Sequence, residues 1–170
     1  RKEYENEETY ITHIKCPRFG SGEAKCVINE TVRGHDVYII CDMFNHGVTY
    51  TMYGVENRMS PDDHYQDLKR IIAAISGKAR RITVVMPMLY EGRQHRRTAR
   101  ESLDCAMALQ ELVNMGVSNI ITFDAHDARV QNAIPLSGFD DVQTTYQMIK
   151  ALSRQVPDIC FDPKKTIVIS

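Results

Sequence analysis

Four arginines fall within the eight residues from 93 to 100, although the whole 170-residue chain has only 21 lysines and arginines. They belong to the polar segment Tyr-Glu-Gly-Arg-Gln-His-Arg-Arg-Thr-Ala-Arg at 90–100. Guanidinium groups match phosphate oxygens through paired hydrogen bonds, so the segment indicates a polyphosphate site. A solvated charged loop ahead of a helix explains the same residues, and both interpretations stay open. The candidate phosphate contacts are Arg93, Arg96, Arg97 and Arg100.

A shorter motif, Asp124-Ala125-His126-Asp127, follows an apolar run at 120–123. An aspartate and a histidine two positions apart can share one exposed site, where the imidazole binds a phosphate or a metal and carboxylates suit Mg²⁺. The alternative is a polar loop in which Asp127 caps a short turn over 128–132. Taken alone, the motif favours this structural interpretation over a ligand site.

Glycine surrounds a third candidate, Phe19-Gly20-Ser21-Gly22-Glu23. Glycines permit a close backbone approach, and a phenylalanine ring can stack on a base. A hairpin turn explains the segment as well. The chain has no phosphate-binding loop of the form G-x-x-x-x-G-K-[S/T]. The remaining histidines have no metal-ligand spacing to one another, so we expect surface or internally satisfied side chains. They are His13, His35, His46, His64 and His95.

The elements that must position these segments alternate between strands and helices. We expect helices over 60–77, 101–115 and 143–155, the first beginning at Ser60 as N-cap and Pro61 and ending at Gly77. Residues 1–17 are expected to be a tail with an edge strand at 10–14, followed by one domain over 18–170. Residues 42–58 are expected to be a loop. The expected strands are 24–28, 37–41, 82–86, 120–123 and 166–169.

This alternation predicts an α/β fold in which helices flank a mainly parallel, twisted sheet. Continuous apolar runs such as 37–41 predict strands buried on both faces. Ligands bind such sheets at the carboxyl ends of the strands. The segments 90–100 and 124–131 both follow predicted strands, so the topology places both at that edge of the sheet.

Composition restricts the function classes. The chain is 43% hydrophobic, has a net charge of -1 and contains no apolar run of spanning length, so we expect neither a non-specific nucleic-acid binder nor a membrane protein. The five cysteines are odd in number and lack a C-x-x-C spacing, which disfavours a disulfide framework or a zinc ribbon. With no apolar signal segment in the first residues, we expect a reducing, cytoplasmic setting.

Together and in order, these segments resemble the ribose-phosphate pyrophosphokinase family, the phosphoribosyl diphosphate synthetases. Residues 19–23 are similar to its F-x-[D/N]-[G/Q]-E, and 30–40 to its E-S-V-R-G-x-D-V-x-I-I. Arg93 and Gln94 match its Y-x-R-Q-D-[R/K]-K, and 124–135 is similar to its D-L-H-A-x-Q-I-Q-G-F-F-D-I-P. The resemblance covers roughly residues 18–170 and implies the N-terminal half of a phosphoribosyltransferase-like protein.

The resemblance implies transfer of diphosphate from Mg·ATP to ribose 5-phosphate, giving phosphoribosyl diphosphate and AMP, in nucleotide biosynthesis. It implies that Arg93 and Gln94 contact ATP and that His126 helps to hold Mg²⁺. Phe19 and Glu23 would reach the adenine of ATP on a neighbouring subunit, which implies a homo-oligomer, a dimer or hexamer.

The chain also departs from the family. It has Ser21, His95 and Ala106 where the family has Asp or Asn, Asp, and Lys or Arg, so a non-catalytic regulatory subunit of the same family remains an alternative. A generic nucleotide-binding module is a weaker one. The family's Pro-Asp-x-G-G, its flexible Lys/Arg loop and its acidic T-x-G-T loop do not occur here. We therefore expect the parent protein to be the enzyme and these 170 residues alone to be inactive.

Overall fold

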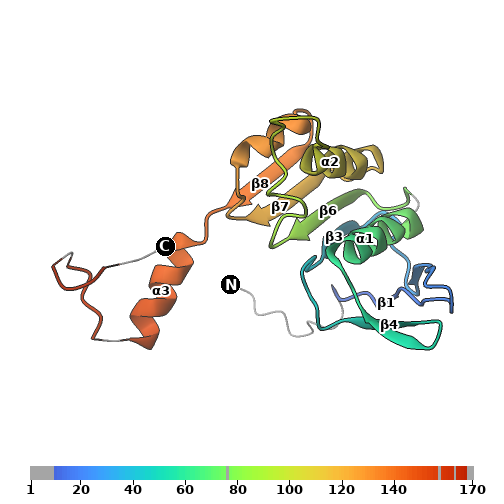
Figure 1. Ribbon diagram of the computed structural model, residues 1–170, viewed down its shortest axis with the longest axis horizontal. Helices are drawn as coiled ribbons and strands as arrows, with labels where there is room; N and C mark the ends of the chain where they lie inside the picture. Colours follow the sequence, from blue (N-terminus) through green and yellow to red (C-terminus); the bar gives the residue numbers. More distant parts are fainter. Residues whose placement is uncertain (1–9, 76, 157, 163, 168–170) are drawn as a thin grey trace.

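A four-stranded parallel sheet organises the chain. The computed structural model describes residues 10–75, 77–156, 158–162 and 164–167. The sheet has the order β3-β6-β7-β8, and each pair of neighbours is parallel (Figure 1). This confirms the predicted α/β architecture with a parallel sheet. Its strands are β3 (Asp36–Ile40), β6 (Arg81–Met86), β7 (Asn119–Phe123) and β8 (Gly138–Val142).

Two helices cover one face of this sheet. Helix α1 (Pro61–Ile75) connects β3 to β6, and α2 (Asp104–Asn114) connects β6 to β7. Two successive crossovers in one direction place both helices on the same face, as Figure 1 shows. Between the helices and the sheet lies the core, in which Leu68, Val84, Leu109, Leu112 and Ile120 are at most 1% exposed.

The start of α1 follows the prediction closely. The Ser60 Oγ accepts a hydrogen bond from the Asp63 backbone N–H (3.2 Å), and the Asp63 carboxylate accepts one from the Ser60 N–H (2.8 Å). These reciprocal bonds satisfy two donors that would otherwise have no partner in the first helical turn. Gly77, with φ +66°, follows the last turn, as predicted.

The opposite face of the sheet differs from the prediction. Strand 37–41 was predicted to be buried on both faces, but Tyr38 and Ile40 are 62% and 75% exposed. Ile39, which points to the helices, is 5% exposed. Within the described residues no helix packs on the face of the sheet that carries Tyr38. The apolar run at 37–41 therefore does not indicate a strand buried on both faces.

The N-terminal part forms short antiparallel pairs. Strands β1 (Ile14–Lys15) and β2 (Val27–Ile28) pair with each other, and they are shorter than the predicted strands at 10–14 and 24–28. Residues 42–58 were predicted to be a loop, which is wrong for their second half. Strands β4 (Thr49–Met52) and β5 (Val55–Arg58) form a hairpin there.

The β4–β5 hairpin turns at Tyr53 and Gly54, whose φ angles are +50° and +80°. Two successive positive φ angles match the right-handed twist of the strands that they join. Glycine adopts this conformation without strain, but tyrosine does so rarely. The second turn residue is therefore the sequence signal for this hairpin.

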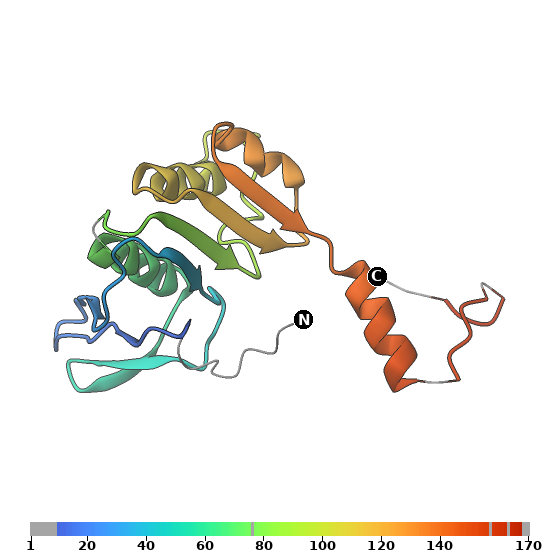
Figure 2. The same ribbon diagram turned by 180° about the vertical axis from the view of Figure 1, so that it is seen from behind.

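The C-terminal part extends away from the sheet. Helix α3 (Thr145–Gln155) agrees with the predicted helix, but the apolar side chains of Tyr146, Ile149 and Leu152 are exposed. Figure 2 shows α3 beyond β8, apart from the sheet. Of the strand predicted at 166–169, Thr166 and Ile167 are described and are not in a strand, and the rest lies outside the described residues. No helix in the described part is long and apolar enough to span a membrane.

Candidate functional site

Residues 90–103, which we call the arginine loop, connect the carboxyl end of β6 to α2. Its first residue, Tyr90, stacks on Tyr65 of α1, with the ring centroids 4.3 Å apart and the planes 5° from parallel. The Tyr90 hydroxyl also donates to the Asp62 carboxylate (2.7 Å). Offset aromatic stacking and a charge-assisted hydrogen bond together fix where the loop leaves the sheet.

Glu101 organises the far end of the arginine loop. Its carboxylate accepts hydrogen bonds from the Thr98 N–H (2.7 Å), the Thr98 hydroxyl (2.7 Å) and the Ala99 N–H (3.0 Å). These bonds favour the charged form, and those from Thr98 contribute most to lowering the pKa of Glu101 below its ordinary value. The backbone that carries Arg100 is thereby held in a turn.

The side chains of the arginine loop divide into two kinds. The Gln94 amide donates to the Ser102 carbonyl oxygen (2.6 Å), and the Gln94 carbonyl accepts from the Cys105 N–H at the start of α2 (3.3 Å). Gln94 thus closes the loop on itself. The four arginines are all exposed, and none forms an ion pair with a residue that the structure describes. They are Arg93, Arg96, Arg97 and Arg100.

Residues 124–127, which we call the histidine loop, follow β7 at the same edge of the sheet. Asp124 has a φ of +45°, a strained conformation for a residue other than glycine. Its carboxylate accepts a hydrogen bond from the Thr144 hydroxyl. The Ala125 N–H donates to the Asp141 carboxylate (2.9 Å). Asp141 of β8 and Thr144 just beyond it therefore hold the segment that leads to His126.

Asp127 has the structural role that the sequence offered as one alternative. Its carboxylate accepts from the Arg129 N–H (2.9 Å) and so caps the short helix η2 (Ala128–Ala133). The Arg129 guanidinium binds the same carboxylate, at 2.9 Å from Nε to Oδ1 and 2.5 Å from Nη2 to Oδ2. These bonds, led by those from the Arg129 side chain, hold the pKa of Asp127 well below its usual range.

His95 brings the two loops together. The distance from its Nδ1 to the Arg93 carbonyl oxygen is 3.0 Å, and that from its Nε2 to the Asp127 Oδ2 is 3.5 Å. Its ring lies against His126, with centroids 5.1 Å apart. Arg93 and His126 are thus carried by neighbouring loops, as the strand order predicts. The contact between the two histidines was not predicted, and its one sequence signal is that both follow neighbouring buried strands.

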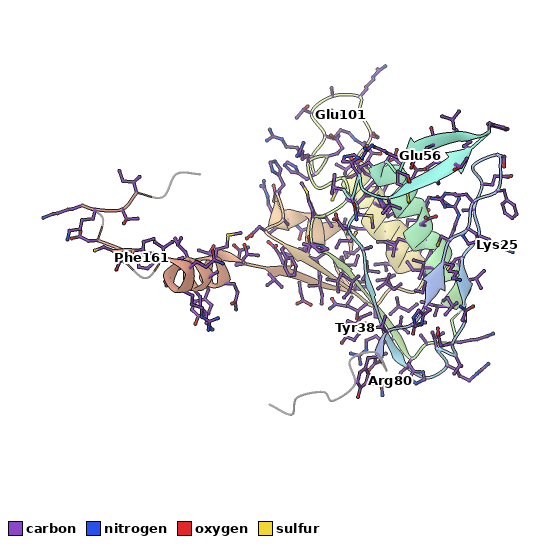
Figure 3. The ribbon with its side chains drawn as sticks, turned by 90° about the horizontal axis from the view of Figure 1, so that it is seen from below. Lys25, Tyr38, Glu56, Arg80, Glu101 and Phe161 are labelled. Atoms are coloured by element: carbon purple, nitrogen blue, oxygen red, sulfur yellow. The ribbon has the colours of Figure 1, made fainter. Side chains whose placement is uncertain are left out.

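The turn at 19–23 lies elsewhere. The Phe19 N–H donates to the Glu23 carbonyl oxygen (2.7 Å), and the Ser21 hydroxyl donates to the Glu23 carboxylate (2.9 Å). The Phe19 ring is 52% exposed. Figure 3 shows Lys25, which follows this turn, well apart from Glu101 in the arginine loop. No hydrogen bond, ion pair or ring contact joins Phe19 or Glu23 to Arg93 or His126 in the described part of the chain.

The histidine loop offers little to a metal ion by itself. No group of three or more histidine, cysteine or acidic side chains suited to a metal occurs in the described part of the chain. Asp124 and Asp127 already bind Thr144 and Arg129. His126 remains as a single candidate ligand, which fits an ion held mainly by the oxygens of a bound polyphosphate, as Mg²⁺ usually is.

Comparison with known proteins gives a consistent result. Residues 4–116 match the family model of the N-terminal domain of ribose phosphate pyrophosphokinase. A ribose-phosphate pyrophosphokinase of Parasynechococcus marenigrum is 32% identical over 119 residues, and one of Vibrio cholerae is 33% identical over 129 residues. These alignments cover 68% and 74% of this chain but only 31% and 34% of the relatives. The chain therefore spans about a third of their length.

A solved structure supports the same fold. The phosphoribosylpyrophosphate synthetase of Mycobacterium smegmatis superposes with a TM-score of 0.72, and the match covers 87% of this chain and 45% of that one. Sequence identity in that match is 19%, so the likeness concerns the fold alone.

Proposed function

Because the chain belongs to the ribose-phosphate pyrophosphokinase family, as its N-terminal domain, we propose that it binds the ATP of a diphosphate-transfer reaction. In that reaction the anomeric hydroxyl oxygen of ribose 5-phosphate attacks the β-phosphorus of ATP. The bond from this phosphorus to the oxygen that bridges it to the α-phosphorus breaks, AMP leaves, and phosphoribosyl diphosphate forms. One observation carries the proposal: the loop with four exposed arginines, which have no carboxylate partner among the described residues, meets the histidine loop through the contact between His95 and His126.

The arginine loop would bind the polyphosphate. Diphosphate transfer consists mainly of positioning and charge neutralisation, to which preorganised cations contribute. Arg93 is the first of the four arginines, and its backbone carbonyl contacts His95, whose ring lies against His126. Arg96, Arg97 and Arg100 add positive charge along the same loop. Gln94, whose amide holds the Ser102 carbonyl, keeps the loop in shape and would contact ATP from that position.

Mg²⁺ would be held by the phosphate oxygens of ATP together with His126, and it supplies charge neutralisation when bound. The chain's own contribution is the orientation of the imidazole. The Asp124–Thr144 bond and the bond from the Ala125 N–H to Asp141 hold the loop just ahead of His126, and the His95 ring lies against the His126 ring.

Phe19 and Glu23 would serve a second subunit. Lys25, which follows their turn, lies well apart from Glu101 of the arginine loop (Figure 3), as expected for a site shared between subunits. Phe19 offers an exposed ring for stacking on adenine, and Glu23 offers a carboxylate, oriented by Ser21, for the adenine amino group. The proposal therefore includes self-association to a dimer or hexamer.

Catalysis would need more than these residues. The sequence contains no acidic T-x-G-T loop for the 5-phosphate and no flexible Lys/Arg loop. We therefore propose that the parent protein is the transferase and that the 170 residues alone bind nucleotide without turnover.

Calorimetric titration of the chain with Mg·ATP tests the proposal. The double variant Arg93→Ala, Arg97→Ala is expected to bind at least about tenfold more weakly, since two charge-assisted contacts are lost. Arg154→Ala, which removes an exposed cation from α3, is the matched control and should bind as wild type. Equal affinities for all three proteins would contradict the proposal.

An activity assay separates this function from the regulatory alternative. The 170-residue chain should form no phosphoribosyl diphosphate from ATP and ribose 5-phosphate, whereas the parent protein should do so. A parent that binds Mg·ATP tightly without turnover would instead favour the regulatory subunit, to which the departures at Ser21, His95 and Ala106 point.

A further inference from the structure

Two cysteines face each other at the base of the turn that carries Phe19 and Glu23. Strands β1 and β2 pair Ile14 with Ile28 and Lys15 with Val27, and the same antiparallel register continues to the bridge between Arg18 and Ala24. Between these pairs, that register places Cys16 opposite Cys26.

The position within the ladder suits a disulfide. Hydrogen bonds join the Lys25 N–H to the Pro17 carbonyl (3.3 Å) and the Phe19 N–H to the Glu23 carbonyl (2.7 Å). Hydrogen-bonded and non-hydrogen-bonded pairs alternate along an antiparallel ladder, so Cys16 and Cys26 form a non-hydrogen-bonded pair, with Cα atoms about 4.5 Å apart. Disulfides span Cα separations of about 4.4 to 6.8 Å.

The two side chains also share one environment. Beside the larger effect of burial, each thiol shifts the pKa of the other, and both residues are half-buried. The other three cysteines are placed differently. The Cys41 thiol donates to the Val85 carbonyl oxygen (3.7 Å), Cys105 is fully buried in the core, and Cys160 is exposed beyond α3.

We propose that Cys16 and Cys26 are a dithiol that small disulfides such as oxidised glutathione convert to an intramolecular disulfide. One thiolate attacks a sulfur of the oxidant and releases one reduced thiol, which gives a mixed disulfide. The second cysteine thiolate then attacks the protein sulfur and releases the other reduced thiol. Both cysteine sulfurs are oxidised by one electron each, the oxidant gains two electrons, and the two protons leave with the released thiols.

Burial makes this reaction slow but does not prevent it. Burial, with Asp67 adding to it, raises the pKa of Cys16 to about 12, and burial also raises the pKa of Cys26. Only the thiolate attacks, so the rate should rise about tenfold for each pH unit between 7 and 9. The second step needs no further encounter, because the partner thiol already lies opposite.

The disulfide would close a loop of eleven residues, 16–26, whose tip is the 19–23 turn. It would therefore fix the base of the segment that, under the proposed function, reaches the adenine on a neighbouring subunit. Formation of the disulfide does not depend on ATP binding. A negative result for the disulfide therefore does not contradict the proposed function, and a negative result for ATP binding does not contradict the disulfide.

Incubation of the 170-residue chain in glutathione buffers of increasing oxidised fraction tests the inference. Free thiols are then alkylated and the protein is digested with trypsin. Trypsin cleaves after Lys15, Arg18 and Lys25, so the bond would join the separate peptides 16–18 and 26–33. We expect this linked pair, the loss of two of the five alkylated thiols, and slower amide exchange in residues 17–25.

Two variants sharpen the result. Cys26→Ser should abolish the linked pair, whereas Cys41→Ser, which removes a half-buried thiol with a similarly raised pKa of about 12, should leave it intact. The inference is overturned if the wild-type chain keeps five alkylated thiols in fully oxidised buffer. It is equally overturned if Cys16 or Cys26 is recovered mainly as a glutathione adduct or linked to Cys160. The decisive result, the linked peptide pair, is measured on the wild-type protein. It can therefore be interpreted even if a variant fails to fold.

Discussion

Arg18 and the arginines of the arginine loop have the same side chain in opposite surroundings. The Arg18 side chain is 9% exposed and binds both Asp67 oxygens, at 2.6 and 2.9 Å, while Asp67 also binds Arg70. Its guanidinium lies 5.1 Å from the centre of the Tyr50 ring. In the arginine loop, by contrast, guanidinium groups are exposed and lack a carboxylate among the described residues.

This contrast separates a structural arginine from a ligand-binding one. Arg18 joins the N-terminal strands to α1, and its charge is already matched by the protein. The guanidinium groups of the arginine loop are free to bind an external anion. The loop itself is held by uncharged or acidic side chains, among them Tyr90, Gln94 and Glu101. The number of arginines alone therefore does not indicate a phosphate site. What distinguishes such a site is that its arginines lack a carboxylate partner within the protein.

The largest effect on stability should come from breaking the Arg18 pair. Asp67→Asn leaves a nearly buried guanidinium without its counter-charge, and we expect the free energy of unfolding to fall by about 2 to 3 kcal/mol. Urea unfolding measures it. Arg93→Met in the arginine loop should change stability by no more than about 0.5 kcal/mol. The distinction fails if the two variants are destabilised equally.

A smaller effect is expected where the arginine loop leaves the sheet. Tyr90→Ala removes both the stack on Tyr65 and the hydrogen bond to Asp62, and should cost about 1 to 2 kcal/mol of unfolding free energy. It should also weaken binding of inorganic tripolyphosphate, since the loop start is no longer fixed. Tyr90→Phe keeps the stack and is the control. If it weakens tripolyphosphate binding as much as Tyr90→Ala does, the stack does not position the loop.

Features of the fold and the site that depend on neighbouring residues could be predicted from the sequence, and features that depend on distant residues could not. Helix α1 was predicted well because Ser60, Pro61 and Asp63 act within one turn. Strand β8 was missed because Asp140 and Asp141 interrupt its apolar pattern, which an edge strand tolerates. The contact between His95 and His126 depends on the pairing of β6 with β7 and on two loop conformations, which the residues between them do not encode locally.

The smallest effect concerns acid stability. The folded pKa of Asp127 lies below its ordinary value of 3.8, mainly because of Arg129. A depressed carboxyl pKa stabilises the fold above the unfolded value, and this contribution is lost as the pH falls below about 4. Carboxyl carbon NMR titration should show the Asp127 pKa rising toward its ordinary value in Arg129→Ala. An unchanged pKa in that variant would assign the effect to another group.

The central claim is that the arginine loop and the histidine loop form one polyphosphate site. Its most direct test is a titration of the ¹⁵N-labelled chain with Mg·ATP at low salt, followed by amide chemical shifts. We predict that residues 93–100 and 125–127 shift together, with one common dissociation constant. Saturating Mg·ATP that leaves both loops unshifted, or shifts one loop without the other, would contradict the account.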